Sequence, residues 1–283
     1  MEKNYRAELI GLFGDPVDGN PIGVVEEAAF AARGLNYRYI ITRVPPDDLE
    51  AAFRGIQAMG FRGANLTMPH KIRILPLLDE IGVSASIIGA VNTVVCRDGR
   101  WIGENSDGKG FVAALLKNGG TLEGKHVTLL GAGGAARAIG VECALAGAAK
   151  ISVINRNAQR GTELAALIAD KTPAQAEYIP WTPAVAIPAG TQILINATCV
   201  GFGADADKAP DICYDTVTPG MYVSDVVFNP TDPLFLQKAR ARGAKTLNGV
   251  GMMVQQGAIN FTIWTGEEAP VDVMYEALSH ELG

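Results

Sequence analysis

The sequence is poor in histidine and cysteine and has no excess of positive charge. Among 283 residues there are 3 histidines and 4 cysteines, and 24 Lys and Arg face 30 Asp and Glu, giving a formal net charge of −6. The cysteines are widely spaced without a C-x-x-C pair, so neither a disulfide framework nor a zinc site is predicted, and no metal is expected. Nucleic acid is not expected as a partner, because neutralising phosphates needs clustered Lys and Arg.

Long apolar runs are also missing. The segment from Met1 to Arg6 has no signal core, and no apolar run reaches membrane-spanning length, so we expect no membrane contact and a cytoplasmic protein. The chain does have 48% hydrophobic and 19% charged residues, a composition typical of a globular protein with a sizeable core. Its length suffices for two domains. The predicted partner is a small molecule, and the predicted state is a monomer or homodimer.

The most informative stretch is an apolar strand that enters a glycine turn and then a helix of small residues. Val127–Leu130 is the strand, and Gly131, Gly133 and Ala136 occupy the positions of a G-x-G-x-x-[G/A] pattern. The first glycine permits a tight turn, the second lets backbone approach a pyrophosphate, and the third small residue lets helix pack on strand. The following helix would direct its N-terminal N–H groups at the phosphates. The pattern therefore predicts dinucleotide binding.

The next strand indicates which dinucleotide. An NAD-selective site usually has Asp or Glu about twenty residues after the glycines. Here the strand Lys150–Ile154 is followed by Asn155, Arg156 and Asn157, with Arg160 one turn later. Two guanidiniums without a carboxylate favour the 2′-phosphate of NADP. NAD stays open, because Arg side chains also stack on adenine, and so does a solvated Arg pair at a helix start.

The order of elements predicts two α/β units with a cleft between them. Residues 1–107 read as alternating strands and helices, with Arg97–Arg100 as the D-G turn of a β-hairpin. Residues 108–251 alternate strand and helix as a doubly wound parallel sheet does. The helical segment 252–283 is predicted to pack back on the first unit.

Several polar residues of the first unit follow predicted strands, which is where open α/β sheets place their ligands. A hydride-transfer site needs a group that exchanges the hydroxyl proton, and a lysine beside a carboxylate serves this purpose. Each residue also has a purely structural interpretation as a turn, cap or surface residue. The residues are Asn65, Thr67, Lys71, Asn92, Thr93, Asn105, Ser106 and Asp107.

Seven motifs in order make the chain resemble the shikimate/quinate dehydrogenase family over nearly its whole length. They are Asn65–Lys71, Gly89–Thr93, Gly103–Gly110, Gly131–Ala136, Asn155-Arg156, Asn196–Thr198 with Gly201, and Gly249–Gly257. The resemblance implies an open mixed-sheet substrate domain joined to a Rossmann domain. It also implies an NAD(P)-dependent oxidoreductase that interconverts a cyclic polyol alcohol and its ketone, such as shikimate and 3-dehydroshikimate, in aromatic amino acid biosynthesis.

The same resemblance implies residue roles. Lys71 would be the catalytic lysine with Asp107 as its partner, and Thr67, Asn92 and Gln256 would bind substrate hydroxyls. The residues predicted to hold the cofactor are Gly131, Gly133, Gly134, Ala135, Asn155, Arg156, Arg160, Asn196, Ala197, Thr198, Val227, Gly249 and Met252.

The loop after the first strand departs from the family pattern. The family normally has Ser-x-Ser-Pro there, whose two hydroxyls bind the substrate carboxylate, but Gly14–Pro21 contains no serine. Asp18 is predicted near the missing hydroxyls, where it would repel a carboxylate by about 4 kcal/mol at 4 Å and an effective dielectric near 20. Alternatively, Asp18 turns outward and Asn20 supplies a donor.

Phe228 also stands where the family commonly has Tyr, so one further hydroxyl is lost at the cleft. We therefore predict weak or absent activity on shikimate. The alternatives are a quinate, aminoshikimate or other specialised dehydrogenase of the family, or a non-catalytic NAD(P)-binding sensor. A sensor would keep the glycine turn and lose the pair formed by Lys71 and Asp107, which this chain retains.

Overall fold

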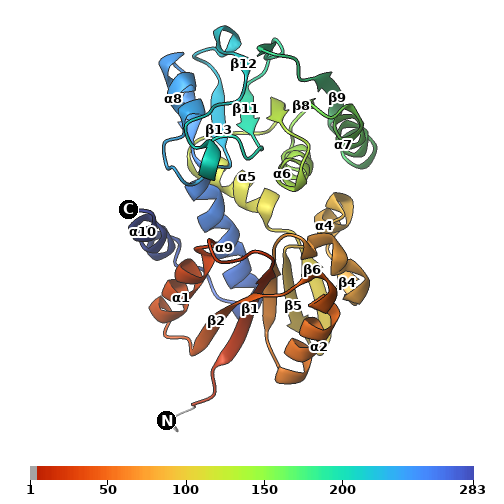
Figure 1. Ribbon diagram of the computed structural model, residues 1–283, viewed down its shortest axis with the longest axis vertical. Helices are drawn as coiled ribbons and strands as arrows, with labels where there is room; N and C mark the ends of the chain where they lie inside the picture. Colours follow the sequence, from red (N-terminus) through yellow and green to blue (C-terminus); the bar gives the residue numbers. More distant parts are fainter. Residues whose placement is uncertain (1–4) are drawn as a thin grey trace. The chain divides into compact units, whose positions relative to one another are not determined.

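The computed structural model describes residues 5–283 and separates into two compact α/β units. The first unit comprises the chain up to Ser106 together with Val254–Gly283, and the second comprises Asp107–Met253. Helix α9 (Gly249–Thr265) contains the return of the chain from the second unit to the first. The predicted two-domain α/β class is confirmed (Figure 1).

The sheet of the first unit has six strands in the order β2-β1-β3-β5-β6-β4 and mixes parallel and antiparallel neighbours. Strand β1 is parallel to β2 and β3, whereas β5 is antiparallel to β3 and β6. The strands are β1 (Glu8–Gly14), β2 (Tyr37–Arg43), β3 (Gly63–Leu66), β4 (Glu80–Ile81), β5 (Thr93–Arg97) and β6 (Arg100–Glu104). The helices are α1 (Ile22–Ala32), η1 (Pro46–Asp48), α2 (Leu49–Met59), α3 (His70–Arg73), η2 (Leu75–Leu77), α4 (Val83–Ile88) and α10 (Val271–Leu282).

Helices cover both faces of this sheet. On one face, Phe53 of α2 meets the edge of Trp101 with ring centroids 5.0 Å apart, within a cluster that includes Phe13. On the other face, the Trp264 indole of α9 donates a hydrogen bond to the carbonyl oxygen of Val94 at 3.0 Å. Gly63 allows this close approach, because a Cβ at that position would collide with the indole nitrogen. The returning C-terminal segment is therefore built into the core of the first unit.

The predicted hairpin is present. Strands β5 and β6 pair antiparallel with Arg97 opposite Arg100. The two connecting residues, Asp98 and Gly99, have φ angles of 51° and 77°. Two positive φ values in a two-residue loop match the twist of the flanking strands, and Asp-Gly is a preferred dipeptide for that turn.

The sheet of the second unit has six parallel strands in the order β14-β13-β11-β7-β8-β9. The strand order reverses between β7 and β11, which is where doubly wound sheets bind their ligands. The strands are β7 (His126–Leu130), β8 (Lys150–Asn155), β9 (Gln175–Pro180), β11 (Ile193–Asn196), β13 (Tyr222–Asp225) and β14 (Lys245–Leu247). The helices are α5 (Asp107–Lys117), α6 (Gly134–Leu145), α7 (Ala158–Lys171), η3 (Gly203–Asp205), η4 (Tyr214–Thr216) and α8 (Leu234–Ala241).

Three details differ from the sequence predictions. The sequence indicated no strand at β4, which pairs with β6. The short strands β10 (Val185–Ala186) and β12 (Ile212–Cys213) pair with each other in a segment where the sequence indicated none. Helix α9 begins at Gly249, three residues before the predicted helical segment 252–283. Two-residue strands carry too little periodicity to be read from sequence, and a glycine-rich helix start resembles a loop.

Candidate active site

The glycine turn after β7 has the geometry that its pattern predicts. Gly131 has a φ of 107° and donates its N–H to the carbonyl oxygen of Ile154 at 2.8 Å. Gly133 and Gly134 are exposed, and a Cβ on either would meet no atom within 4 Å. Ala136 is fully buried where α6 packs against the sheet. The turn therefore leaves open backbone at the start of a twelve-residue helix, which is the arrangement that binds pyrophosphate.

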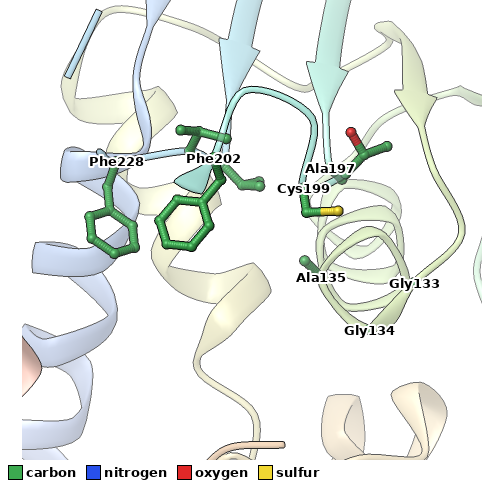
Figure 2. Close-up of a pocket in the computed structure, with 10 residues that line it drawn as sticks. Gly133, Gly134, Ala135, Ala197, Cys199, Phe202 and Phe228 are labelled. Atoms are coloured by element: carbon green, nitrogen blue, oxygen red, sulfur yellow. The ribbon is translucent and has the colours of Figure 1, made fainter. Parts of the chain in front are cut away.

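A cavity of about 350 Å³ lies at the carboxyl ends of β7, β11 and β13. Figure 2 shows Gly133, Gly134 and Ala135 on one side of it and the rings of Phe202 and Phe228 on the other. The two rings have centroids 5.6 Å apart. A mainly apolar cavity with a few polar groups is typical of cofactor sites. Its lining residues are Gly133, Gly134, Ala135, Ala197, Thr198, Cys199, Phe202, Val226, Val227 and Phe228.

The segment after β8 presents two exposed guanidiniums. Asn157 begins α7, and its Oδ1 accepts a hydrogen bond from the Arg160 backbone N–H at 2.9 Å. Asn155 donates through Nδ2 to the Asn157 carbonyl oxygen at 2.9 Å, which stiffens the turn. Arg156 and Arg160 are exposed, and neither belongs to an ion pair within residues 5–283. Both side chains are therefore available to bind a phosphate.

Asn196 is fully buried and does not line the cavity, and its predicted contact with the cofactor stays a prediction. Its Nδ2 donates to the Val200 carbonyl oxygen at 3.1 Å and to Asp225 Oδ1 at 3.0 Å, and its Oδ1 accepts from the Thr198 hydroxyl at 2.7 Å. Asn196 therefore shapes the loop, while Ala197 and Thr198 line the cavity.

The three remaining residues predicted to hold the cofactor, Val227, Gly249 and Met252, differ in whether they line the cavity. Val227 lines the cavity, whereas Gly249 and Met252 do not. Gly249 donates its N–H to the Val227 carbonyl oxygen at 2.9 Å, and a Cβ on Gly249 would collide with the Val226 backbone. Gly249 thus supports the cavity wall by allowing α9 to start directly against it.

In the first unit, the strands β3, β5 and β6 bring the predicted polar residues to one edge of the sheet. Asn92 is buried; its Nδ2 donates to the Ser106 hydroxyl at 3.0 Å, and its Oδ1 accepts from the Ser106 backbone N–H at 2.8 Å. Thr93 donates its hydroxyl hydrogen to Asn260 Oδ1 at 2.7 Å. Thr67 is half-buried just past β3. These contacts place residues from three distant segments together.

Lys71 lies beside this polar edge. It is half-buried in α3, and its backbone carbonyl oxygen accepts a hydrogen bond from the Val91 N–H at 2.8 Å. Since Val91 precedes Asn92, this bond ties the lysine to the same edge of the sheet. Asp107 directly follows Ser106, begins α5 and is buried. The pairing of Lys71 with Asp107 stays a prediction.

Gln256 is half-buried on α9. It precedes Asn260 by four residues, so both side chains lie on the same face of the helix. Asn260 contacts Thr93, which directs this face of α9 toward the polar edge. The placement suits a residue that binds a substrate hydroxyl.

The loop before α1 contains an exposed aspartate and an asparagine whose side-chain oxygen accepts a backbone hydrogen bond. Asp18 is exposed, and Asn20 Oδ1 accepts a hydrogen bond from the Ile22 N–H at 3.1 Å. Asn20 therefore supports the first turn of α1 through its oxygen. Asp15 of the same loop pairs with Arg43 at 2.7 Å.

Three cavity residues were absent from the sequence prediction: Cys199, Phe202 and Val226. Each lies within a few residues of a predicted site residue, at the end of a strand of the parallel sheet. A rule that every residue following β11 and β13 belongs to the site would have found them. Their residue types did not indicate a role in the site, because an apolar residue after a strand is usually interpreted as part of the hydrophobic core.

Within residues 5–283, no three His, Cys, Asp or Glu side chains group closely enough to hold a metal ion. The same part of the chain contains no helix long and apolar enough to cross a membrane.

The second unit is a doubly wound sheet with a cavity where its strand order reverses, and the first unit is a mixed sheet with a polar edge. This is the architecture of a two-domain dinucleotide-binding protein. Comparison with known families agrees. The model described as the shikimate dehydrogenase substrate binding domain matches residues 12–94, and the one described as the shikimate 5′-dehydrogenase C-terminal domain matches residues 249–278. The chain belongs to the shikimate dehydrogenase family.

Individual relatives match over almost the whole chain. A shikimate dehydrogenase (NADP(+)) of Desulforamulus reducens is 40% identical, with 99% of this chain and 97% of the relative covered. The ligand-free crystal structure of a 5-ketofructose reductase of a Gluconobacter species is 45% identical, with a TM-score of 0.95 and coverage of 98% and 100%. A Listeria monocytogenes shikimate 5-dehydrogenase in complex with shikimate and NAD is 37% identical, with a TM-score of 0.91 and 96% of each chain covered.

Proposed function

We propose that the chain transfers a hydride between NADP and a secondary alcohol or ketone of a polyhydroxylated substrate. This is the reaction type of its relatives named shikimate dehydrogenase (NADP(+)). The observation that carries the proposal is the polar edge of the first unit, where Asn92, Ser106 and Thr93 are held by mutual hydrogen bonds and the backbone of Lys71 is bonded to the neighbouring Val91. In this proposal Lys71 and Asp107 exchange the hydroxyl proton, while Thr67, Asn92 and Gln256 bind neighbouring hydroxyls.

The cofactor in this proposal lies across the carboxyl edge of the second sheet. Its diphosphate meets the glycine turn, its 2′-phosphate meets Arg156 and Arg160 after β8, and its nicotinamide half lies in the cavity at β11 and β13. The strand order supports this arrangement, because β8 and β11 lie on opposite sides of β7. NADP supplies or accepts the hydride when bound.

Replacing Arg156 with Ala tests the cofactor assignment. We expect the KM for NADP to rise about 10- to 100-fold and the KM for NAD to change little, because a hydrogen bond between charged groups contributes about 1.5–3 kcal/mol. Arg242→Ala, which removes an exposed guanidinium that pairs with Asp215, is the matched control. Equal effects on the two cofactors would contradict a phosphate contact.

Two substrate classes fit this site, and the loop before α1 favours a neutral one. The two hydroxyls that bind a carboxylate elsewhere in the family are missing, and the exposed Asp18 adds negative charge to this loop. The phenyl ring of Phe228 also offers no hydroxyl. The substrate of the relative named 5-ketofructose reductase is a neutral polyhydroxy ketone, so we favour that class for this chain. Shikimate is the second candidate, favoured by the shikimate dehydrogenase relatives.

A reductive assay with NADPH distinguishes the two classes. Losing two hydrogen bonds to a charged group costs about 3 kcal/mol or more, so we expect kcat/KM for 3-dehydroshikimate to be about 100-fold or more below that for 5-ketofructose. Quinate and shikimate are tested with NADP in the oxidative direction. The reverse order, with shikimate preferred and a micromolar KM, would establish the second candidate. Turnover of neither class by an enzyme that binds NADP would overturn the proposed reaction.

A further inference from the structure

Two loops that line the cofactor cavity are joined by one buried pair of side chains. The loop after β11 contains Ala197–Phe202, and the loop after β13 contains Val226–Phe228. Asn196 and Asp225 end these two neighbouring strands and lie opposite each other in the parallel register. Asn196 Nδ2 donates to Asp225 Oδ1 at 3.0 Å, and the Val227 N–H donates to the same oxygen at 3.0 Å. Asp225 is therefore bonded directly to a residue of the cavity wall.

Asn196, the other member of the buried pair, is also hydrogen-bonded to both loops. Asn196 uses its Oδ1 to accept from Thr198, and its backbone carbonyl oxygen accepts from the Val226 N–H at 3.0 Å. Thr198 and Val226 both line the cavity. A change of charge at Asp225 thus acts on both loops through one or two hydrogen bonds.

Asp225 is 1% exposed, and its Oδ2 has no hydrogen-bond partner among residues 5–283. Burial raises its pKa to about 7, and the hydrogen bonds that the carboxyl accepts from Val227 and Asn196 oppose that rise. A group with this environment is poised to change charge near neutral pH. No step of the hydride transfer described above uses it.

The groups packed around Asp225 do not titrate in the same range. From β11 the neighbour is the neutral amide of Asn196, and from η4 it is Tyr214, whose phenol pKa is raised by its own burial and by Asp225 and Asp211. From α8, the Lys238 ammonium lies 4.9 Å from the centre of the Tyr214 ring. A phenol with a raised pKa stays neutral from pH 5 to pH 9, so a charge change of this cluster in that range belongs to Asp225.

We propose that Asp225 is a positioning residue of the cofactor cavity whose negative charge favours the oxidised nicotinamide nucleotide over the reduced one. The inference rests on the proposed function, which places the nicotinamide in the cavity at β11 and β13. The nicotinamide ring is cationic when oxidised and neutral when reduced. A carboxylate behind the apolar wall of Val226 and Val227 attracts the cation, and the attraction is weakly screened because the wall excludes water. Binding of NADP therefore expels a proton from Asp225, and binding of NADPH does not.

Calorimetric titration with NADP and NADPH between pH 5.5 and pH 8.5 tests the inference on the full-length protein. We expect the affinity ratio of NADP to NADPH to rise about fivefold or more as the pH passes through about 7. The 2′-phosphate also titrates near pH 6, but both nucleotides carry it, so its effect cancels in the ratio. Titrations in buffers of different ionisation enthalpy should show proton release with NADP near pH 7.

Matched variants test whether Asp225 causes the pH dependence of the affinity ratio. Asp225→Asn keeps the oxygen that accepts from Asn196 and Val227, and it should give a ratio that does not depend on pH. Asp215→Asn, which changes an exposed carboxylate of η4, should behave like the wild type. Lys71→Met should also keep the pH-dependent ratio, because the effect does not involve the proton that the substrate exchanges.

The outcomes separate the two claims. The inference would be overturned if the affinity ratio of NADP to NADPH did not depend on pH in the wild type, or if Asp225→Asn kept the pH dependence of the wild type. Either result would leave the proposed function standing. Loss of the effect in Lys71→Met would also overturn the inference, and this result decides the question even if Asp225→Asn does not fold. Binding of neither nucleotide would overturn the proposed function and the inference with it.

Discussion

Replacing Lys71 with Met is expected to lower kcat about 10²- to 10⁴-fold while leaving the dissociation constant of NADP nearly unchanged. This range is the contribution of a positioned acid–base group, and Met keeps the length of the side chain without a proton to exchange. The backbone of α3 should stay in place, because the bond from the Val91 N–H to Lys71 uses the main-chain oxygen. The measurement is the steady-state rate with the best substrate, together with nucleotide binding by calorimetry.

Arg73 provides a matched control in the same helix. It is a half-exposed cation that pairs with Asp47 at 3.7 Å, and Arg73→Met should change kcat less than about threefold. Asp107→Asn should lower kcat as well, because a neutral amide cannot balance the ammonium of Lys71. If Lys71→Met oxidised the best substrate at nearly the wild-type rate, the assignment of the proton carrier would be wrong.

Replacing Glu26 with Met is expected to stabilise the fold. Glu26 lies on α1, is fully buried, and neither carboxyl oxygen has a hydrogen-bond partner among residues 5–283. Glu26 Oε1, Met274 Cε and Ile22 Cδ1 lie together around Gly257, and burial and the nearby Glu26 raise the pKa of the Tyr39 phenol. Leaving a buried polar group unpaired costs about 1–3 kcal/mol, so we expect the free energy of unfolding to rise by about that amount at pH 8.

The stability gained by Glu26→Met should increase as the pH rises. Burial raises the pKa of Glu26 well above its usual value, so the folded state retains a proton that the unfolded state releases. Below about pH 4 the group is protonated in both states and has no effect on the pH dependence. As the pH rises above that value, the wild type loses stability relative to Glu26→Met until the pH passes the raised pKa. The difference between the two proteins should therefore be larger at pH 8 than at pH 5.

Urea unfolding followed by circular dichroism at the two pH values measures this difference. Glu50→Met removes an exposed carboxylate that pairs with Arg54 on α2, and it should change stability by less than about 0.5 kcal/mol at either pH. A stability difference for Glu26→Met that is the same at pH 5 and pH 8 would show that the folded state holds Glu26 ionised.

The glycine turn and the hairpin were predictable because their signals are local. Gly131 adopts a positive φ, and Gly133 has free space where a Cβ would be, so that a ligand can approach the backbone. Glycine at these two closely spaced positions predicts both features. Asp98-Gly99 likewise specifies its own turn. The six main strands of the second unit follow from the alternation of apolar runs and helical segments.

The roles of individual polar side chains were less predictable. Asn196 was predicted at the cofactor from its motif, and nothing in that motif indicated that its side chain links two loops. Cys199 and Phe202 were not expected at all and line the cavity. Which atoms a polar residue bonds depends on which strand lies next to it, and the register of a parallel sheet joins residues far apart in the chain.

The amino-acid sequence by itself determined the α/β class, the dinucleotide turn, the arginines that follow the second strand of that unit, and the absence of serine from the loop before the first helix. These features depend on residue type and short spacing. The tertiary structure alone decided that Asn196 faces Asp225, that Asp225 is almost fully buried, and that Glu26 is fully buried without a hydrogen-bond partner among residues 5–283. Burial and pairing are set by segments that meet only when the chain is folded, and burial in turn sets the charge of a carboxyl group.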